Sequence, residues 1–530
     1  MNATLPEMLE RVTRADGDCV AIVDGNCRRT YAELADASSR IATGLAHLGV
    51  RRGDLVALWL PNSLAWVELE FAIARLGAVA VGINTKLRSH DVGQLLMQSR
   101  ASVLVAWPGF KGIDFLGMVG QIADTVPDSL RLVFVGDHDT AEVAASLRSR
   151  VTSYDTLLQH SPMTTSAAAP ELPSNVFSSS GTTSAPKLVL HCQSALVTHA
   201  EAVAKSFGYA ASDTVVLGML PFCGVFGFNT LTAALAAGRP LVVQAAFDAD
   251  DAVALIERYK ITHTNGADEM LRRILTAARP VERIASLREA GFANFGGDAR
   301  PLVQAAAEVG KKFFQTYGAS EVQALMCYPP VGSDVDRWSV GGGVPVSECT
   351  HARVRNVDTG ELVGDGIDGE IEISGPNVTV GYMGRPDLTT KSRTEDGWWR
   401  TGDFGRLADG RDFIYLARLG DALRLGGFLV GVSEIEGYLE TLAGVTAAQV
   451  VGVCGNHGDV AVAFVIGEGL DEAALLQQCR SELARFKVPR CIAIVEEFPM
   501  THGANGDKIQ RVQLRAMAAG LLAEREEIRT

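Results

Sequence analysis

The sequence predicts an α/β protein with a large N-terminal domain of layered sheets and helices, a β-rich subdomain and a small α+β C-terminal domain. Short apolar runs typical of buried strands alternate with helix-like segments from the start of the chain to about residue 340. Such alternation indicates α/β layers with largely parallel sheets. From about Gly341 the strands become short and glycine is frequent, which favours an antiparallel subdomain. At roughly 150 residues per domain, 530 residues allow about three or four structural units.

The expected elements of the N-terminal region follow one another in a regular order. The β-rich apolar runs predict strands at residues 55–60, 78–83, 103–107, 132–135, 175–177, 214–217, 241–244 and 293–295. The segments between them predict helices at residues 31–48, 62–76, 194–207, 252–259 and 301–309. The pattern as a whole is that of repeated strand–helix units.

The chain changes texture towards its C-terminus. Residues 341–417 are expected to form the β-rich subdomain. After Arg418 a compact α+β tail is expected, with helices at 433–442 and 472–484 and strands at 450–453, 461–466 and 492–495. We therefore place a domain boundary near residues 417–421, between an N-terminal domain of residues 1–417 and a C-terminal domain of residues 422–530.

Composition and charge exclude several classes of protein. Hydrophobic residues make up 47% and charged residues 21% of the chain, as in ordinary globular proteins. Lys and Arg number 48 against 62 Asp and Glu, and this net charge of −14 argues against a nucleic-acid or anionic-membrane binder. No apolar run of about 18 residues predicts a membrane span. The nine cysteines form no CxxC pair and no signal peptide is recognisable, so reduced thiols in the cytoplasm are expected.

The most informative segment is FSSSGTTSAPK at residues 177–187. It follows a predicted strand, contains six hydroxyl residues and a glycine, and ends at Lys187. Hydroxyl groups and exposed backbone N–H groups can wrap phosphate oxygens, and a lysine adds a positive charge. The same composition is common in flexible Ser/Thr linkers, so the segment alone leaves both interpretations open.

This segment resembles the phosphate-binding loop of the adenylate-forming superfamily, which includes acyl-CoA synthetases, aryl-CoA ligases, luciferases and the adenylation domains of peptide synthetases. The superfamily pattern is roughly (Y/F)TSGTTGxPKGV. Two of its glycines are replaced here, by Ser184 and Leu188. The positions that match it are Ser180, Gly181, Thr182, Thr183, Pro186 and Lys187.

Further matches follow in the superfamily's order. They are GGDA at 296–299, QTYGASE at 315–321, GEIEISG at 369–375 with Gly381-Tyr382, GWWRTGD at 397–403, Arg418, LRLGGF at 423–428 with EIE at 434–436, and NGDKIQR at 505–511. The resemblance covers nearly the whole chain. It implies the superfamily's fold, in which a small C-terminal domain moves about a hinge that corresponds here to residues 418–421.

The resemblance also implies how ATP and Mg²⁺ bind. Tyr317 would offer a flat face to the purine and Ser320 a hydroxyl to phosphate, while Glu321 would offer a hard oxygen to Mg²⁺. Asp403 would accept both ribose hydroxyls, and Arg418 would contact ribose and phosphate. The positions that match the superfamily's nucleotide contacts are Ser180, Gly181, Thr182, Thr183, Gly297, Asp298, Ala299, Tyr317, Gly318, Ser320, Asp403 and Arg418.

The implied chemistry is the activation of a carboxylic acid. Lys187 and the Mg²⁺ ion on Glu321 would hold the departing pyrophosphate, and Lys508 of the C-terminal domain would bridge the acid and the α-phosphate. The product is an acyl-adenylate. After rotation about the hinge, where Gly420 takes the pivot position, the thiolate of CoA would attack the adenylate. The expected cofactors are therefore ATP, Mg²⁺ and CoA.

The pocket for the acid is expected around the stretch LPFCGVFG at residues 220–227. Gly224 stands where the superfamily often has histidine, which leaves room for a medium, cyclic or aromatic acid. Phe226 and Asn229 are further candidates for its lining. Asp268, with Glu269 beside it, is either a carboxylate favoured by a helix N-terminus or a polar contact to the substrate.

Several functions remain open on the sequence alone. The first is an acid–CoA ligase that releases AMP and pyrophosphate. The alternatives keep the adenylation step but pass the acyl group to an amino acid, an amine or a carrier-protein thiol. A degenerate, non-catalytic binder is disfavoured because Lys187, Glu321, Asp403 and Lys508 are all present. By analogy a homodimer is expected.

Overall fold

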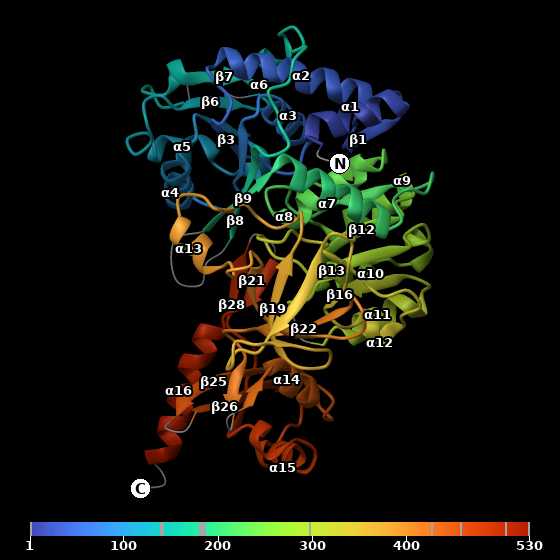
Figure 1. The fold of residues 1–530 in the computed structure, drawn as a ribbon, viewed down its shortest axis with the longest axis vertical. Helices are drawn as coiled ribbons and strands as arrows, with labels where there is room; N and C mark the ends of the chain where they lie inside the picture. Colours follow the sequence, from blue (N-terminus) through green and yellow to red (C-terminus); the bar gives the residue numbers. More distant parts are fainter. Residues whose placement is uncertain are drawn as a thin grey trace.

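The computed structural model describes residues 3–137, 143–179, 187–295, 298–425, 428–455, 458–503 and 506–527. In this part of the chain, two mainly parallel sheets and one antiparallel sheet are built before Arg418, and a smaller α+β region follows (Figure 1). The α/β fold class predicted from the alternation of strands and helices is confirmed.

The first sheet carries the predicted site residues that follow its parallel strands. Its strands, in spatial order, are β14 (Lys312–Gln315), β13 (Glu289–Ala293), β12 (His263–Ala267), β10 (Val216–Gly218), β11 (Leu241–Val243), β1 (Val20–Asp24) and β2 (Cys27–Thr30). The strands from β14 to β1 run parallel, and β2 returns antiparallel to β1. The strand predicted at 293–295 lies earlier, because the N–H group of Phe295 leaves the ladder and donates to the carboxylate of Asp268.

The second sheet carries the strand that leads into the hydroxyl-rich loop. Its order is β20 (Gly381–Tyr382), β9 (Lys187–Cys192), β8 (Pro173–Ser179), β4 (Val79–Gly82), β3 (Leu55–Trp59), β5 (Val103–Ala106), β6 (Arg131–Phe134) and β7 (Val151–Ser153). The strands from β8 to β7 are parallel, whereas β9 returns antiparallel to β8. This hairpin therefore brackets the loop at one end of the sheet.

The third sheet is antiparallel and corresponds to the predicted β-rich subdomain. Its order is β15 (Cys327–Tyr328), β16 (Gly342–Pro345), β22 (Phe413–Arg418), β21 (Trp399–Leu407), β19 (Gly369–Ser374), β17 (His351–Arg355) and β18 (Leu362–Val363). Figure 1 shows β19, β21 and β22 in the middle of the molecule, next to the first sheet.

Helices cover the sheets of the N-terminal region. α1 and α2 begin with capping boxes, in which Thr4 pairs with Glu7 and Thr30 with Glu33. The helices are α1 (Leu5–Asp16), α2 (Tyr31–His47), α3 (Leu64–Arg75), α4 (Ser89–Ser99), α5 (Phe115–Gln121), α6 (Tyr154–Leu158), α7 (Gln193–Ser206), α8 (Val225–Ala236), α9 (Ala249–Tyr259), α10 (Asp268–Ala277), α11 (Arg300–Glu308), α12 (Val335–Trp338) and α13 (Pro386–Lys391). Within the described residues, none of the helices combines the length and apolar character that a membrane crossing needs.

Most of the residues after Arg418 lie at the lower end of the molecule in Figure 1, whereas residues 500–503 are drawn higher, near its middle. Two apolar clusters hold them together, one on each side of the sheet β25–β26–β27. The elements are β23 (Leu423–Leu425), β24 (Phe428–Val430), α14 (Val432–Glu440), β25 (Val445–Gly455), β26 (Gly458–Gly467), α15 (Glu472–Glu482), β27 (Cys491–Ile494), β28 (Met500–Gly503), β29 (Gly506–Ile509) and α16 (Arg511–Glu527).

A buried carboxyl group anchors the strand that leads to the hydroxyl-rich loop. Glu70 of α3 is 1% exposed, and the side-chain amide of Asn175 in β8 donates a 2.9 Å hydrogen bond to Glu70 Oε1. Burial raises the pKa of Glu70 to about 8. Glu70 is therefore largely protonated at neutral pH, which lowers the cost of burying it.

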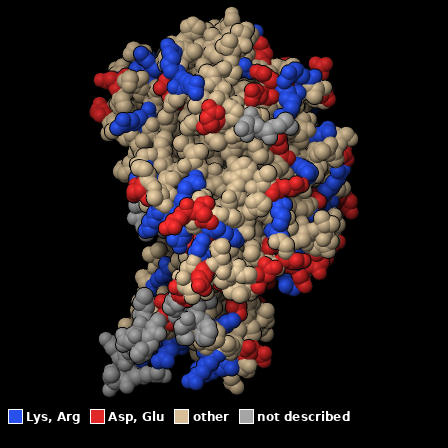
Figure 2. All heavy atoms as spheres, viewed as in Figure 1, with Lys and Arg blue, Asp and Glu red and all other residues tan. Residues whose placement is uncertain are grey.

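Charged side chains of both signs are spread over the surface. Figure 2 shows Lys and Arg interspersed with Asp and Glu on the face that it draws. The whole chain has a net charge of −14. On this face the acidic side chains lie among basic ones and are not gathered in one acidic region.

Candidate active site

Three neighbouring parallel strands deliver predicted site residues to one edge of the first sheet. β12 is followed by Asp268, β13 by the turn that contains Asp298, and β14 by Tyr317. The carboxyl ends of adjacent parallel strands meet at the same edge, where open α/β sheets usually bind ligands. This edge is therefore the candidate active site.

Asp403 lies at the centre of a cluster of predicted nucleotide residues. The hydroxyl of Tyr317 donates a 2.5 Å hydrogen bond to Asp403 Oδ2, and Arg418 Nη1 lies 2.9 Å from Asp403 Oδ1. Asp403 is 2% exposed. Burial raises the pKa of its carboxyl group, and the charge of Arg418 opposes that rise. An ionised carboxylate only accepts hydrogen bonds, which suits the two hydroxyls of a ribose.

Tyr415 belongs to this cluster although the sequence reasoning gave it no role. Its ring lies 5.7 Å from that of Tyr317, centroid to centroid. In the ladder between β21 and β22, Asp403 faces Arg418 and Gly405 faces Tyr415, so a bulge separates the two pairs. Because residues 403 and 405 lie on one face of β21, Tyr415 and Arg418 also share a face. Simple alternation along β22 would have placed them on opposite faces.

Tyr382 connects two of the predicted catalytic residues. Its hydroxyl donates a 2.8 Å hydrogen bond to Glu321 Oε1, and the ammonium group of Lys187 lies 5.0 Å from the centre of its ring. Burial raises the pKa of the Tyr382 phenol, and the charge of Glu321 adds to that rise. Tyr382 thus contacts the expected metal-binding carboxylate through its hydroxyl and the expected phosphate-binding lysine through the face of its ring. The motif Gly381-Tyr382 had signalled the position but not this role.

Two buried histidines fasten the loop that carries Ser320 and Glu321. His191 Nε2 lies 2.7 Å from the carbonyl oxygen of Ser320, and His199 Nε2 lies 2.7 Å from that of Ala324. Burial lowers the pKa of each imidazole to about 4, so both rings are neutral and donate these bonds. Their contacts are with the backbone, which gives them a role in holding the loop.

Asn229, predicted to line the acid pocket, is fully buried behind the same loop. Its amide nitrogen donates to Gln323 Oε1 at 2.8 Å, and its oxygen accepts the N–H of Ala324 at 2.9 Å. Gln323 and Leu325 have φ values of 65° and 57° in the left-handed region, which side chains other than glycine rarely adopt. Asn229 therefore stabilises this strained stretch in the described structure.

The other predicted pocket residues lie near the start of two helices. Gly224 is the N-cap of α8, and Phe226 follows in its first turn, partly buried. Asp268 begins α10 and is 4% exposed, and its Oδ1 accepts the N–H of Phe295 at 3.2 Å. Burial raises the pKa of Asp268. Besides the two roles expected from the sequence, Asp268 thus holds the chain just before the turn at 296–299.

A carboxylate from the C-terminal region reaches this turn. Glu440 of α14 accepts the N–H of Asp298 at 3.0 Å through Oε2 and the N–H of Ala448 at 3.0 Å through Oε1. Burial raises the pKa of Glu440 to about 7. Ala299 is 2% exposed and caps α11. No sequence motif had pointed to Glu440.

Several predicted residues lie outside the described structure. They are the loop residues Ser180, Gly181, Thr182 and Thr183, together with Gly297 of the turn. The backbone of Lys508 lies in β29, opposite Thr501 of β28, but its side chain is not described. Among the described residues, no group of three or more His, Cys, Asp or Glu side chains could hold a metal ion by itself.

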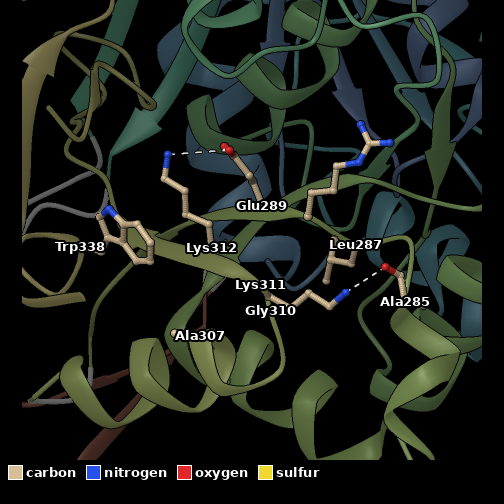
Figure 3. A pocket seen from close by; sticks show the side chains of 9 residues that line it. Ala285, Leu287, Glu289, Ala307, Gly310, Lys311, Lys312 and Trp338 are labelled. Atoms are coloured by element: carbon tan, nitrogen blue, oxygen red, sulfur yellow. Dashed lines mark hydrogen bonds and ion pairs between the residues drawn. The ribbon is translucent and has the colours of Figure 1, made fainter. Parts of the chain in front are cut away.

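A separate cavity of about 380 Å³ lies at the amino ends of β13 and β14 (Figure 3). Lys312 Nζ lies 3.7 Å from Glu289 Oε1, and Lys311 donates to the carbonyl oxygen of Ala285 at 2.9 Å. Because Glu289 and Lys312 are the first residues of their strands, the cavity is at the opposite edge of the sheet from Tyr317. Its cations are already paired, and it is distinct from the candidate site.

Comparisons with known proteins decide the family. A family model described as AMP-binding enzyme matches residues 9–383, and one described as AMP-binding enzyme C-terminal domain matches residues 434–504. The chain belongs to the AMP-binding enzyme family. The superfamily predicted from the ordered motifs is therefore confirmed.

Individual members of this family are similar to this chain over nearly their full length. A 3-[(3aS,4S,7aS)-7a-methyl-1,5-dioxo-octahydro-1H-inden-4-yl]propanoyl:CoA ligase of Mycobacterium tuberculosis is 31% identical over 531 residues, 97% of this chain and 99% of the relative. A 2-succinylbenzoate–CoA ligase of a Geobacillus species is 28% identical over 523 residues, 98% of each chain. The crystal structure of the anthranilate CoA ligase AuaEII with anthranoyl-AMP shares the fold, with a TM-score of 0.82, 24% identity and 98% coverage of each chain. The predicted class of enzyme, an AMP-forming acid–thiol ligase, is confirmed.

Proposed function

We propose that this chain is an AMP-forming acid–CoA ligase whose carboxylic acid carries a ring. The observation that carries the proposal is the cluster of Tyr317, Asp403 and Arg418 at the sheet edge, in a member of the AMP-binding enzyme family. The pair Lys187 and Glu321, joined through Tyr382, supplies groups of the charge that phosphates and a metal ion require.

The nucleotide lies with its purine on Tyr317 and its ribose on Asp403. The guanidinium of Arg418 stands beside the same carboxylate and can reach both ribose and phosphate. Asp298 and Ala299 belong to the turn at 296–299, which would contact the purine, and Gly318 and Ser320 would border the phosphates. The residues Ser180, Gly181, Thr182 and Thr183, with Gly297, complete the binding site in this proposal.

Glu321 holds Mg²⁺. Its carboxylate provides the hard oxygen that Mg²⁺ prefers, and Mg²⁺ usually takes its remaining ligands from phosphates and water. The lack of a metal-binding group of three acidic or imidazole side chains in the described residues fits that arrangement. When bound, the ion would neutralise negative charge on the phosphates of ATP. Lys187 supplies a second positive charge to the same phosphates.

The first step forms the acyl-adenylate. A carboxylate oxygen of the acid attacks the α-phosphorus of ATP, and the bond to the bridging oxygen of pyrophosphate breaks. Two anions react only if their charge is neutralised and their atoms are aligned. In this proposal Lys508 would bridge the acid and the α-phosphate and serve both purposes.

The second step transfers the acyl group to CoA. Residues 422–530 rotate about the hinge at 418–421, which removes Lys508 and admits the thiol. The sulfur attacks the carbonyl carbon, the bond to AMP breaks, and the thiol proton passes to solvent. Arg515 of α16 donates to the carbonyl oxygen of Gly420 at 3.1 Å and pairs with Asp421 at 2.5 Å, so it holds the pivot in the present arrangement.

The acid carries a ring. Gly224 at the start of α8 leaves space where the superfamily often has a histidine, and Phe226 offers an aromatic neighbour. Both curated relatives and the anthranilate ligase are named for ring-containing acids. Asn229, on the same helix, holds the stretch around Gln323 and Ala324, and Asp268 holds the chain at Phe295.

We also propose a cytoplasmic location and a homodimer. The eight cysteines whose side chains are described are all free, as expected in a reducing compartment. The homodimer rests on analogy alone, and the elution volume and scattering mass of the purified enzyme test it.

The products identify the reaction directly. Purified enzyme is incubated with ATP, MgCl₂ and CoA, with benzoate, 2-succinylbenzoate, indane propanoates and straight-chain acids, and the mixture is analysed by mass spectrometry. A parallel series replaces CoA with amino acids and amines. We expect an acyl-CoA with AMP and pyrophosphate for at least one ring acid. An amide as the sole product would overturn the assignment of CoA as acceptor. Activity confined to straight-chain acids would overturn the proposal that the acid carries a ring.

A further inference from the structure

The segment that presents Asp403 is a bulge in an otherwise regular ladder. Between β19 and β21, Glu370 pairs with Phe404 and Glu372 with Arg400. Ile371 alone therefore faces three residues of β21, which are Thr401, Gly402 and Asp403. Gly402 has a φ of 69°, in the left-handed region that favours glycine. Backbone groups in such a bulge lose their partners in the ladder and need others.

Side chains supply those partners. Oε1 of Glu370 accepts the N–H of Gly402 at 3.3 Å. The hydroxyl of Thr401 donates to the carbonyl oxygen of Ile371 at 2.6 Å and accepts the N–H of Asp403 at 3.0 Å. The bulge is thus held by one carboxylate and one hydroxyl, through three hydrogen bonds that each involve a residue from 401 to 403.

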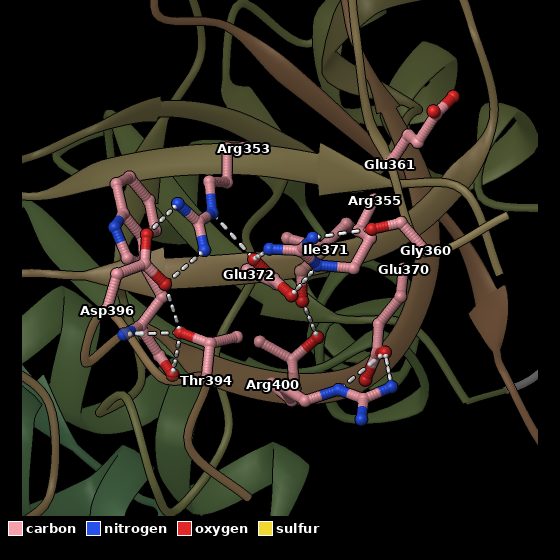
Figure 4. Close-up of polar contacts among 12 residues, drawn as sticks. Arg353, Arg355, Gly360, Glu361, Glu370, Ile371, Glu372, Thr394, Asp396 and Arg400 are labelled. Atoms are coloured by element: carbon pink, nitrogen blue, oxygen red, sulfur yellow. Dashed lines mark hydrogen bonds and ion pairs between the residues drawn. The ribbon is translucent and has the colours of Figure 1, made fainter.

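An arginine balances the charge of Glu370. Arg400 donates to Glu370 Oε2 from Nε at 3.0 Å and from Nη2 at 2.5 Å (Figure 4). Glu370 is 4% exposed, and its charge adds to the burial that raises the pKa of Asp403. Arg400 offsets that charge, and its two N–H groups converge on one oxygen, Oε2, which leaves Oε1 to accept the N–H of Gly402. Glu370 therefore binds both Arg400, next to the bulge, and the N–H of Gly402 within it.

We propose that Glu370 is a positioning residue for nucleotide binding: with Arg400 and Thr401 it sets the place of Asp403 for the ribose hydroxyls. The inference rests on the proposed function, in which Asp403 accepts those hydroxyls. Glu370 itself touches neither the nucleotide nor the acid in this proposal and acts through the bulge.

Glu372 offers a matched control two residues along the same strand. It is fully buried, and its carboxylate accepts from Nε of Arg353 and from Nε of Arg355 at 2.6 Å each. Arg353 also forms an ion pair with Asp396, as Figure 4 shows. These contacts stabilise the outer part of the third sheet and do not involve residues 401–403. Loss of either carboxylate should weaken the sheet, but only the loss of Glu370 should weaken binding of the ribose.

Binding of nucleotides that differ in the ribose separates the two roles. Isothermal titration calorimetry measures the dissociation constants of AMP, 2′-deoxyAMP and 3′-deoxyAMP for the full-length protein, so no acid substrate is needed. The wild type should prefer AMP over at least one deoxy analogue by about tenfold, the size expected for a hydrogen bond to a charged group. Glu370→Ala should lose about tenfold in AMP affinity and bind that analogue within about twofold of the wild type, so that its preference disappears.

Further variants keep the test decisive if Glu370→Ala folds poorly. Thr401→Val preserves shape, removes the bond to the N–H of Asp403 and should also reduce the preference. Glu370→Gln retains an acceptor for Gly402 and should retain part of it. The double variant Glu370→Ala/Asp403→Ala should bind AMP no worse than Asp403→Ala. Glu372→Gln should lower the melting temperature and keep the preference of the wild type.

Either of two kinds of result would overturn the inference. If the Glu370 and Thr401 variants keep the wild-type preference for AMP, or if Glu372→Gln removes it equally, Glu370 has only a general role in stability. If the wild type and Asp403→Ala bind all three nucleotides equally, the ribose assignment of Asp403 fails and the inference fails with it. In that case adenylation can still be tested by its products, so the two failures are distinguishable.

Discussion

The hydroxyl of Tyr317 and the carboxylate of Asp403 are joined by a 2.5 Å hydrogen bond across 86 positions of the chain. Tyr317 follows β14 of the parallel first sheet, whereas Asp403 lies in β21 of the antiparallel third sheet. The bond therefore connects the two sheets at the edge where the nucleotide is proposed to lie. Purine and ribose contacts are thereby brought into one site by residues that no local pattern joins.

The ring of Tyr317 should matter more for nucleotide binding than its hydroxyl. Tyr317→Phe keeps the flat face and should change the AMP dissociation constant by less than about threefold, whereas Tyr317→Ala should raise it by about tenfold or more, because stacking on a base is worth roughly 1–3 kcal/mol. Calorimetric titration with AMP measures both. Equal losses in the two variants would contradict the stacking role.

Removing the charge of Glu321 should impair catalysis through the metal ion. Glu321→Gln keeps the shape of the side chain and can still accept from Tyr382. Its rate of acid-dependent pyrophosphate exchange should fall by about 100-fold, in the range of lost electrostatic stabilisation, and recover in part at higher MgCl₂. Tyr382→Phe keeps the charge and should lose less than about tenfold. An unchanged Mg²⁺ dependence in Glu321→Gln would show that Glu321 does not hold the ion.

Lys508 should be needed for only one of the two half-reactions. Lys508→Ala should abolish formation of the acyl-adenylate from ATP and acid, because the charge between the acid and the α-phosphate is lost. The same variant should still convert synthetic acyl-adenylate and CoA into thioester at close to the wild-type rate. Stopped assays of each half-reaction measure this. A parallel loss of both would contradict the proposed rotation that removes Lys508 before the second step.

Glu70 should make stability depend on pH. Its pKa is raised from 4.5 to about 8 by burial, so between these values the folded protein holds a proton that the unfolded chain has lost. The free energy of unfolding should therefore fall with rising pH in this window, by up to about 1.4 kcal/mol per pH unit, and level off above it. Glu70→Gln is neutral throughout.

The melting temperature of Glu70→Gln relative to wild type should accordingly rise between the two pKa values. Differential scanning calorimetry across this range measures it. Glu308→Gln, at an exposed position of α11, is the control for removing a carboxylate without burial. A constant difference for Glu70→Gln would mean that Glu70 does not carry the proposed proton.

Short sequence motifs identified the residues whose roles follow from their type and from their order along the chain. Tyr317, Glu321, Asp403 and Arg418 were expected from short patterns, and the structure gathers Tyr317, Asp403 and Arg418 within hydrogen-bonding distance. Most strands and helices were also expected near their observed bounds, because apolar runs and helical segments reflect burial directly. The comparisons confirm the family that these motifs indicated.

Residues that act through a change of register could not be found in this way. Tyr415 shares a face with Arg418 only because a bulge interrupts β22, and Glu370 meets Gly402 only because of the bulge in β21. Glu440 reaches Asp298 across 142 positions by the packing of a separate region. The strand at Glu289–Ala293 was placed too late, because Ala290, Gly291 and Ala293 carry little β-propensity of their own.

The central claim is that this protein makes an acyl-adenylate from ATP and a ring-bearing acid. The most direct test follows radioactive pyrophosphate into ATP in the presence of purified enzyme, MgCl₂ and one acid at a time, without CoA. Exchange that depends on a ring acid and is lost in Asp403→Ala is the predicted result. Absence of exchange with every acid, or breakdown of ATP to ADP instead of AMP, would contradict the claim.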